Sequence, residues 1–390
     1  MKESYDYQNF NKLYKATASK YYEPKSLYEL KNHIKENNKV RVFGSVHAFN
    51  DISLPAGSGA LIKTNNLDKV LEINKKNNTV KIESGVILYK LLDELAVHNL
   101  TIPSVTATSY VSVVGAISTG AHGSNSKLGS MANLVISAEI VKADGTLLEI
   151  NENMEEMKAI RCSLGCIGAI YSVTLQCENM FGILEEKKVF KWNDFYNNMD
   201  TLLEKYDYLQ ATIDPFDDQM NTHVELKQKV KLDSKTKGYK NLTSKYNEYY
   251  IEIELAFAYE LADKALRSII KYHRFYYKKY GIKSDSTILI RFSGSDNSFI
   301  SMCSDRKTIY ISTFFGKGIE PEKVYKFMKK LCNKMIKLYN ARPHYGKIND
   351  LNKNQMEQIY GSNYKNFQII KNKLDPTNKF SNDYINRIFN

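Results

Sequence analysis

The stretch Ser112-Val113-Val114-Gly115-Ala116-Ile117-Ser118-Thr119-Gly120-Ala121-His122-Gly123-Ser124 decides the fold. Small side chains let a backbone approach another group closely, so these residues predict a loop that lies against a bound group. The stretch differs from the dinucleotide fingerprint G-x-G-x-x-G and from a phosphate-binding loop that ends in Gly-Lys-Ser/Thr. A Rossmann dehydrogenase and a nucleoside triphosphatase are therefore disfavoured.

The residues before this loop show helix and strand patterns in turn. We expect helices over residues 26–36, 67–72 and 88–98, and strands over residues 39–43, 59–62 and 79–83. Apolar residues at helical spacing support the helices, and alternation that ends at a glycine supports the strands. This rhythm is typical of a small α+β unit.

The residues after the loop indicate two further strands and then a change of amino-acid composition. Strands are expected over 132–143 and 168–177, with a second glycine-rich turn at Ser163–Gly168 between them. Beyond Cys177 the chain is rich in aromatic and charged residues. Strands are predicted over residues 224–229, 249–257, 287–292 and 308–315, and helices over residues 260–279 and 321–339. This pattern predicts a second domain, an antiparallel sheet covered by helices.

Composition excludes several classes of protein. The 390 residues contain 43% hydrophobic and 12% aromatic residues, which is typical of packed globular proteins of about two or three domains. No apolar run reaches the roughly 18 residues that a membrane span needs, and the N-terminus lacks an apolar signal region. Five cysteines are an odd number, which favours a reducing compartment over a disulfide framework. We therefore expect a cytoplasmic protein with no membrane segment.

The net charge of +12 is interpreted as a property of the surface. The lysines gather in two clusters, Lys227, Lys229, Lys231, Lys235 and Lys237, and Lys329, Lys330, Lys334 and Lys337. Both clusters are typical of solvated faces, and no nucleic-acid-binding module accompanies them. Cys162 and Cys166 have no second Cys/His pair nearby, so no metal site is predicted. We expect a small-molecule substrate and no nucleic-acid partner.

Three further segments carry chemistry-bearing side chains. Gly44-Ser45-Val46-His47-Ala48-Phe49-Asn50-Asp51 places a histidine on a turn just after a strand, where an imidazole can face a ligand. The others are Ala341-Arg342-Pro343-His344-Tyr345-Gly346-Lys347 and Asp375-Pro376-Thr377-Asn378-Lys379-Phe380-Ser381-Asn382. In order and spacing, these segments and the two glycine-rich turns resemble the FAD-dependent oxidases of the vanillyl-alcohol-oxidase superfamily. The resemblance covers nearly the whole chain and is closest to the alditol oxidase and aldonolactone (gulonolactone-type) oxidase branch.

The resemblance implies an α+β fold with three parts. These are a two-subdomain FAD-binding domain over residues 1–178, a substrate domain with a helix-covered antiparallel sheet over 179–345, and a C-terminal segment over 346–390 that returns to the active site. It also implies that His47 is bonded covalently to the 8α-methyl group of the flavin. Backbone amides of a glycine-rich turn can cradle the two charges of the FAD pyrophosphate. The implied cofactor-binding residues are Gly44, Ser45, Val46, His47, Ala48, Phe49, Ser112, Gly115, Ser118, Thr119, Gly120, His122, Gly123, Ser124, Ser163, Gly165, Gly168 and Ile170.

The resemblance also assigns the catalytic side chains. His344 and Lys379 are candidates for accepting the hydroxyl proton or polarising the alkoxide, and Arg291 is a candidate for orienting the substrate. An Asp-Pro turn would bring Lys379 back over the active site, where burial would lower its pKa. The alternative for Arg291 is an ion pair with a carboxylate such as Asp296. The implied substrate-binding residues are Ser112, Leu289, Arg291, His344 and Lys379, while His122 is interpreted as fixing the loop.

One residue departs from the family pattern. The family usually has a glutamate two residues before the arginine that corresponds to Arg291, and here that position is Leu289. Alternation along a strand puts both side chains on one face, so the pocket should be less polar there. The alternative is that Leu289 points into the core and that Glu254 or Glu252 on a neighbouring strand acts as the acceptor.

The implied activity is the oxidation of an alcohol carbon of a polyol, sugar or sugar lactone. Hydride would pass to flavin N5, and oxygen would accept the electrons. Two other readings are a flavin-fold binding protein without turnover and a flavoenzyme that acts on a lipid-linked sugar.

Overall fold

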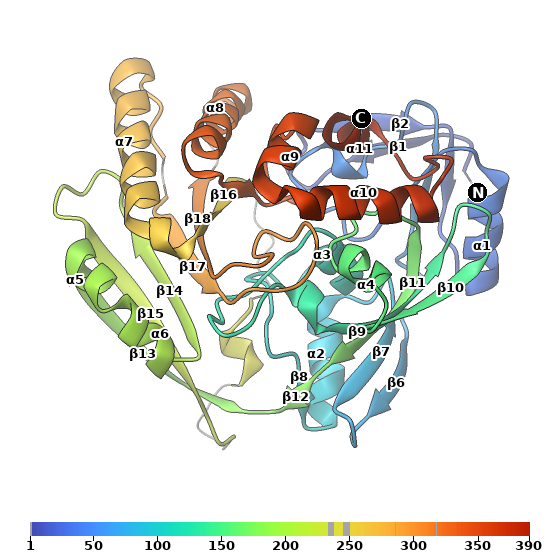
Figure 1. Ribbon diagram of the computed structural model, residues 1–390, viewed down its shortest axis with the longest axis horizontal. Helices are drawn as coiled ribbons and strands as arrows, with labels where there is room; N and C mark the ends of the chain where they lie inside the picture. The colour runs from blue at the N-terminus through green and yellow to red at the C-terminus, as the bar shows by residue number, and fades with distance from the viewer. Residues whose placement is uncertain (1, 233–237, 245–249, 285, 317) are drawn as a thin grey trace.

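The computed structural model describes residues 2–232, 238–244, 250–284, 286–316 and 318–390. In Figure 1 the N-terminal sheets lie on the right, the largest sheet lies on the left, and the C-terminal helices lie above them. Most buried apolar residues of all three parts belong to one continuous core. The expectations for Lys235, Lys237 and Tyr249 fall outside the described residues.

The N-terminal part contains a small parallel sheet in the order β3-β5-β4. Its strands are β3 (Lys20–Tyr22), β5 (Ala60–Lys63) and β4 (Val40–Phe43), and helix α1 (Leu27–Glu36) connects β3 to β4. The Ser26 side chain accepts a hydrogen bond from the Glu29 amide and caps α1, which buries Leu30 and Ile34. The helix and both strands predicted for this region are confirmed.

A five-stranded antiparallel sheet completes the N-terminal part, in the order β10-β9-β11-β7-β6. Its strands are β10 (Leu147–Asn151), β9 (Val135–Val141), β11 (Ala169–Gln176), β7 (Thr79–Glu83) and β6 (Val70–Asn74). The helix predicted over 67–72 is wrong, because Val70 and Ile73 pair with β7 as part of β6. Three apolar residues at helical spacing were too short a pattern to outweigh this pairing.

The largest sheet has seven antiparallel strands, in the order β13-β15-β14-β17-β18-β16-β19. They are β13 (Gly182–Lys191), β15 (Asn221–Val230), β14 (Tyr208–Ile213), β17 (Ile288–Ser293), β18 (Thr308–Phe315), β16 (Ile251–Ala258) and β19 (Arg342–Pro343). Helices α7 (Ala262–Tyr280) and α8 (Pro321–Tyr339) lie together at the top of this sheet in Figure 1 and contact β16. The predicted helix-covered antiparallel sheet is confirmed.

The remaining elements are short. They are β1 (Tyr5–Gln8), β2 (Lys15–Ala18), α2 (Leu88–Val97), β8 (Leu100–Thr101), α3 (Val113–Ser118), α4 (Glu156–Ile160), β12 (Glu178–Asn179), α5 (Trp192–Asn197), α6 (Met199–Lys205), α9 (Lys353–Tyr360), α10 (Ser362–Leu374), α11 (Asp383–Phe389) and the 3-10 turns η1 (Asp51–Ser53), η2 (Met131–Leu134), η3 (Tyr239–Asn241) and η4 (Tyr259–Leu261). The Arg387 guanidinium pairs with Asp51 at 2.9 Å, so α11 packs on the N-terminal part. In the part of the chain that the structure describes, no helix has the length and apolar character to cross a membrane.

Candidate active site

A cavity of about 800 Å³ lies where the N-terminal part meets the seven-stranded sheet. Residues 44–49, the loop around α3 and the turn at 163–170 form one part of its wall. The sheet residues Glu252, Glu254, Leu289 and Arg291 and the turn His344–Lys347 form the other. Segments far apart in the sequence therefore meet in one cavity, as the sequence predicts.

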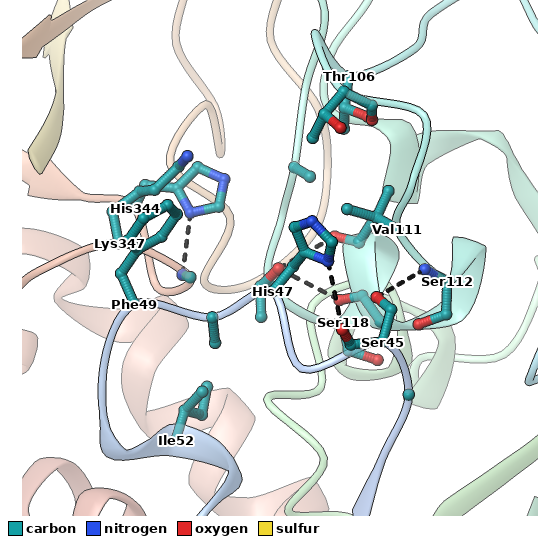
Figure 2. Close-up of a pocket in the computed structure, with 18 of the residues that line it drawn as sticks. Ser45, His47, Phe49, Ile52, Thr106, Val111, Ser112, Ser118, His344 and Lys347 are labelled. Atoms are coloured by element: carbon teal, nitrogen blue, oxygen red, sulfur yellow. Dashed lines mark hydrogen bonds between the residues drawn. The ribbon is translucent and has the colours of Figure 1, made fainter. Parts of the chain in front are cut away.

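The turn that carries His47 is packed tightly against α3. The Ser45 hydroxyl accepts a hydrogen bond from the Ser112 amide at 3.0 Å, and a Cβ on Gly115 would lie 2.5 Å from the Ser112 hydroxyl oxygen. His47 Nδ1 lies 3.2 Å from the Ser45 carbonyl, and its ring stacks on Phe10. Figure 2 shows His47 between the Ser45 and Ser112 side of the cavity and the His344 and Lys347 side.

The His47 turn is also bonded to the turn at 344–347. The Phe49 amide donates to the Gly346 carbonyl at 2.8 Å. The Asn50 side chain donates to the carbonyls of Tyr345 at 2.7 Å and Lys347 at 2.8 Å. These bonds fix the two turns relative to each other.

Most of the predicted cofactor-binding residues line the cavity. They are Gly44, Ser45, Val46, His47, Ala48, Phe49, Ser112, Gly115, Ser118, Thr119, His122, Ser163, Gly165, Gly168 and Ile170. Arg41 holds the second glycine-rich turn, since its guanidinium donates to the carbonyls of Leu164 at 2.6 Å and Gly165 at 2.9 Å.

Three predicted residues lie outside the lining, which corrects that part of the prediction. Gly120 has a φ of +68°, a turn conformation that suits glycine, and a Cβ there would meet Cys162. A Cβ on Gly123 would lie 2.7 Å from the Val105 carbonyl oxygen. The Ser124 carbonyl accepts a hydrogen bond from the Leu209 amide. These three residues therefore position the loop through contacts outside the cavity lining.

The cavity fits a long cofactor with a phosphate-bearing centre. Gly165 and Gly168 have φ values of +63° and +139°, so the backbone at that end adopts conformations that other residues rarely reach. Gly44 and Gly115 both pack against the Ser112 side chain, and this brings the backbone of the two segments together in the cavity lining, where backbone amides suit phosphate oxygens. At the other end, Glu254 Oε2 and Arg291 Nε are buried without a hydrogen-bond partner among the described residues.

Glu254 on β16 is the centre of the charged end of the cavity. Its Oε1 accepts a hydrogen bond from Arg291 Nη2 at 2.8 Å and lies 2.8 Å from His122 Nε2. Burial opposes its ionisation, but Arg291 and His122 outweigh burial and hold the pKa of Glu254 well below its usual range. The alternative that Arg291 pairs with a carboxylate is confirmed, but the partner is Glu254 and not Asp296, which accepts from the hydroxyls of Ser130 and Ser301.

His344 and Lys347 face the same end of the cavity. His344 Nδ1 accepts a hydrogen bond from the Gly346 amide at 2.9 Å, and burial lowers the pKa of His344 to about 3. The neutral ring therefore carries its proton on Nε2. Lys347 forms an ion pair with Glu252, and its ammonium lies 4.6 Å from the Phe49 ring centre. Burial would favour the neutral amine, but Glu252 outweighs it and raises the pKa of Lys347.

Lys379 lies elsewhere, which corrects the prediction that it faces the active site. Its Nζ donates to the Ile34 carbonyl at 2.8 Å, and it lines a separate hollow with Lys39 and Lys142. Asp375 accepts a hydrogen bond from the Lys379 amide, so the turn does bring the tail back, but onto α1. Lys347 lines the cavity instead. The sequence does contain a signal for it, because Lys347 lies in the same segment as His344, two residues after Tyr345.

Leu289 lines the cavity beside Arg291, as alternation along β17 predicts. Glu252 and Glu254 line it as well. The alternative in which Leu289 points into the core is therefore wrong, although the carboxylates on β16 that it named do line the cavity.

Two family models match the chain. An FAD binding domain matches residues 18–151, and a D-arabinono-1,4-lactone oxidase model matches residues 223–388. L-gulonolactone oxidase from Mus musculus is 25% identical over 98% of each chain. L-gulono-1,4-lactone dehydrogenase from Mycobacterium tuberculosis is 24% identical over 91% of each chain. Alditol oxidase from a Streptomyces species is 30% identical over 35% of this chain and 33% of its own.

Solved structures show the same fold. Cholesterol oxidase from Brevibacterium sterolicum superposes with a TM-score of 0.81 at 15% identity, over 99% of this chain and 97% of that chain. The FAD binding domain, the lactone oxidase domain and the named relatives identify an FAD-linked oxidoreductase that acts on CH–OH groups, and its fold is of the vanillyl-alcohol-oxidase type. Within this class, the chain is similar to the aldonolactone oxidases and the alditol oxidases, and its residues 223–388 match the D-arabinono-1,4-lactone oxidase model.

Proposed function

We propose that this enzyme oxidises an alcohol carbon of a sugar lactone or polyol and passes the electrons from its FAD to oxygen. The observation that carries the proposal is the charged end of the cavity, where Arg291, Glu254, His344 and Lys347 converge. The names of the relatives, which include lactone oxidases and an alditol oxidase, support this substrate class.

FAD, when bound, supplies the acceptor for the hydride that leaves the alcohol carbon. The residues of the chain bind and orient the alcohol. Arg291 and Lys347 are cations, and they stabilise the negative charge that develops on the substrate oxygen. His344 donates from Nε2, so its geometry favours polarising the oxygen over accepting a proton. Phe49 and Phe314 are apolar parts of the lining and reduce the access of water.

We also propose that His47 is the point of covalent attachment to FAD. His47 lies on a turn that the bonds to Ser112 and to the 344–347 turn hold in place, and its ring projects into the cavity. On a denaturing gel, the parent protein should show flavin fluorescence that His47→Ala lacks. Native His47→Ala should still bind FAD, because the backbone contacts remain. A non-fluorescent parent band from yellow native protein would contradict the attachment.

An anaerobic titration tests the activity. The purified protein should show a flavin absorption spectrum that is bleached by at least one of L-gulono-1,4-lactone, L-galactono-1,4-lactone, D-arabinono-1,4-lactone and xylitol. On admission of air, the spectrum should return with one equivalent of hydrogen peroxide. A folded protein without flavin, or a flavin that none of these compounds reduces, would contradict the proposal. Slow reoxidation by air without peroxide would contradict oxygen as the acceptor.

A further inference from the structure

Glu254 combines three properties at the charged end of the cavity. It is buried, with 1% of its surface exposed. It lines the cavity. Its Oε1 takes the contacts from both Arg291 and His122, while its Oε2 has no partner among the described residues. A buried carboxylate oxygen without a donor is costly, so its persistence beside a cavity points to a donor that arrives with a ligand.

His122 and Glu254 form a hydrogen-bonded dyad. His122 Nε2 lies 2.8 Å from Oε1, and its Nδ1 lies 2.9 Å from the Gly123 carbonyl oxygen. Burial lowers the pKa of His122, so the ring is neutral, and a hydrogen on Nε2 can be donated to Oε1. His122 also stacks on Tyr310, with ring centres 3.4 Å apart, which fixes its orientation. The lone pairs that remain available on this dyad are those of Oε2.

The other ionisable groups at this end of the cavity already have partners within the protein. Glu252 pairs with Lys347, which is protonated. His344 accepts at Nδ1 from the Gly346 amide and carries its proton at Nε2. Lys347 and His344 therefore offer no acceptor in the arrangement observed, and the Oε2 atom of Glu252 is taken by Lys347.

We propose that Glu254 is the proton acceptor of the reaction and acts through Oε2, with His122 and Arg291 as positioning residues. This inference rests on the proposed oxidation of an alcohol. The substrate O–H bond breaks and an O–H bond to Oε2 forms. The electron pair of the broken bond becomes the second C–O bond of the carbonyl product, while the hydrogen on carbon leaves with its own pair as hydride to FAD, which is reduced by two electrons.

The low basicity of Glu254 suits a proton transfer that accompanies the transfer of hydride. Arg291 and His122 keep Glu254 ionised, so it is a weak base. Because the base is weak, the proton moves to Oε2 only as hydride leaves the carbon, and Arg291 and Lys347 stabilise the partial negative charge on the oxygen during this transfer. Before the reaction, the ionised Oε2 of Glu254 also accepts a hydrogen bond from the substrate hydroxyl, and this bond fixes which hydroxyl is oxidised.

The position of Glu254 defines the geometry of the substrate. On the sheet, Leu289 pairs with Ser312 and Ser312 pairs with Glu254, so the apolar and acidic side chains share one row, two strands apart. The substrate should therefore present its reacting hydroxyl toward β16 and a less polar part toward β17.

Substitution of Glu254 tests the inference. Glu254→Gln keeps the shape of the side chain and removes the base, so flavin reduction by the substrate that reduces the parent should slow about 10²- to 10⁴-fold. FAD content should stay unchanged. The control is Glu149→Gln, the same change on the exposed face of β10, which should reduce at the parental rate.

Chemical rescue separates the proposed role from a structural one. In Glu254→Ala, added formate should enter the space left by the side chain and restore at least tenfold in the reduction rate, whereas chloride at equal ionic strength should not. If Glu254→Gln fails to fold, Glu254→Asp retains the charge, withdraws the oxygen by one methylene, and should slow reduction at least tenfold with FAD still bound.

The outcomes are distinguishable. A parent that none of the tested lactones or polyols reduces contradicts the proposed function and this inference together. A parent that is reduced, beside a Glu254→Gln variant within threefold of its rate, overturns the inference alone. A slow Glu254→Ala variant that formate does not accelerate also overturns it.

Discussion

Glu252 and Glu254 lie two residues apart on the same face of β16, and their pKa values shift in opposite directions. Burial raises the pKa of Glu252, and its ion pair with Lys347 does not fully offset the effect. Burial acts on Glu254 too, but Arg291 and His122 outweigh it and lower the pKa. Two neighbouring carboxylates thus have different roles: Glu252 holds Lys347 in place, and Glu254 remains ionised beside the substrate space.

The two lysines of the C-terminal region should respond differently to substitution. Lys347→Met should slow flavin reduction by at least about 10²-fold, because it removes a cation that stabilises charge on the substrate oxygen. Lys379→Met should stay within threefold of the parent, because the Lys379 ammonium bonds to the Ile34 carbonyl outside the cavity. Stopped-flow reduction rates measure both. A slow Lys379→Met with normal folding and a fast Lys347→Met would reverse the assignment.

Leu289 should disfavour simple polyols. A hydroxyl held against this side chain would be buried without a partner, at a cost of roughly 1–3 kcal/mol. Xylitol and sorbitol should therefore reduce the flavin more slowly than substrates with an apolar, deoxy or substituted carbon at that position. Leu289→Glu should raise polyol turnover. A substrate panel decides the matter: unsubstituted polyols that are oxidised as fast as deoxy or substituted sugars would contradict the prediction.

His273 should make the folded protein less stable at acid pH. Its side chain is buried against Phe315 and Phe327, and burial lowers its pKa from 6.5 to about 3. Because the unfolded chain binds the proton more tightly, the stability that neutral His273 contributes is complete above pH 6.5. Below that pH it falls by about 1.4 kcal/mol per pH unit toward pH 3.

The variant His273→Leu isolates this contribution. Its melting temperature should fall less than that of the parent between pH 7 and pH 5. Parallel melting curves for the two proteins across this range would show that His273 does not titrate as stated. The pKa of His344 is lowered in the same direction, so the His273→Leu variant retains part of the acid sensitivity of the parent.

Arg41 should be needed both for folding and for FAD affinity. Its guanidinium donates to the carbonyls of Ile52 at 2.7 Å and Phe380 at 3.1 Å, as well as to the second glycine-rich turn. Arg41→Met should lower the free energy of unfolding by about 2–4 kcal/mol, because buried carbonyls lose their donor. The matched Arg267→Met on the surface of α7 should cost under about 1 kcal/mol. Thermal unfolding measures both variants, and equal losses of stability in Arg41→Met and Arg267→Met would contradict this prediction.

The sequence predicted the site best where a local pattern set the chemistry. The resemblance to known oxidases assigned His47 and Arg291 to the site, and alternation along β17 then placed Leu289 on the same face as Arg291. Lys379 could not be placed correctly, because the Asp-Pro turn gives the direction of the chain but not the surface that its tail packs on.

Long-range pairing explains the other differences. The partner of Arg291 is Glu254, which lies two strands away across β18, and sequence spacing contains no information on that strand order. The strand β6 was missed for the same reason, since its pairing with β7 decides its conformation.

The hydrogen bonds from Phe49 and Asn50 to residues 345–347 have a consequence for the construction of chimeric enzymes. The turn that follows β4 and the turn that follows β19 are bonded backbone to backbone and side chain to backbone, although almost 300 residues separate Asn50 from Tyr345. A hybrid that takes its seven-stranded sheet from one relative and its N-terminal part from another would divide this pair of turns between two parents. Residues 44–51 and 344–349 should therefore be inherited from the same parent, even where the crossover lies far from both.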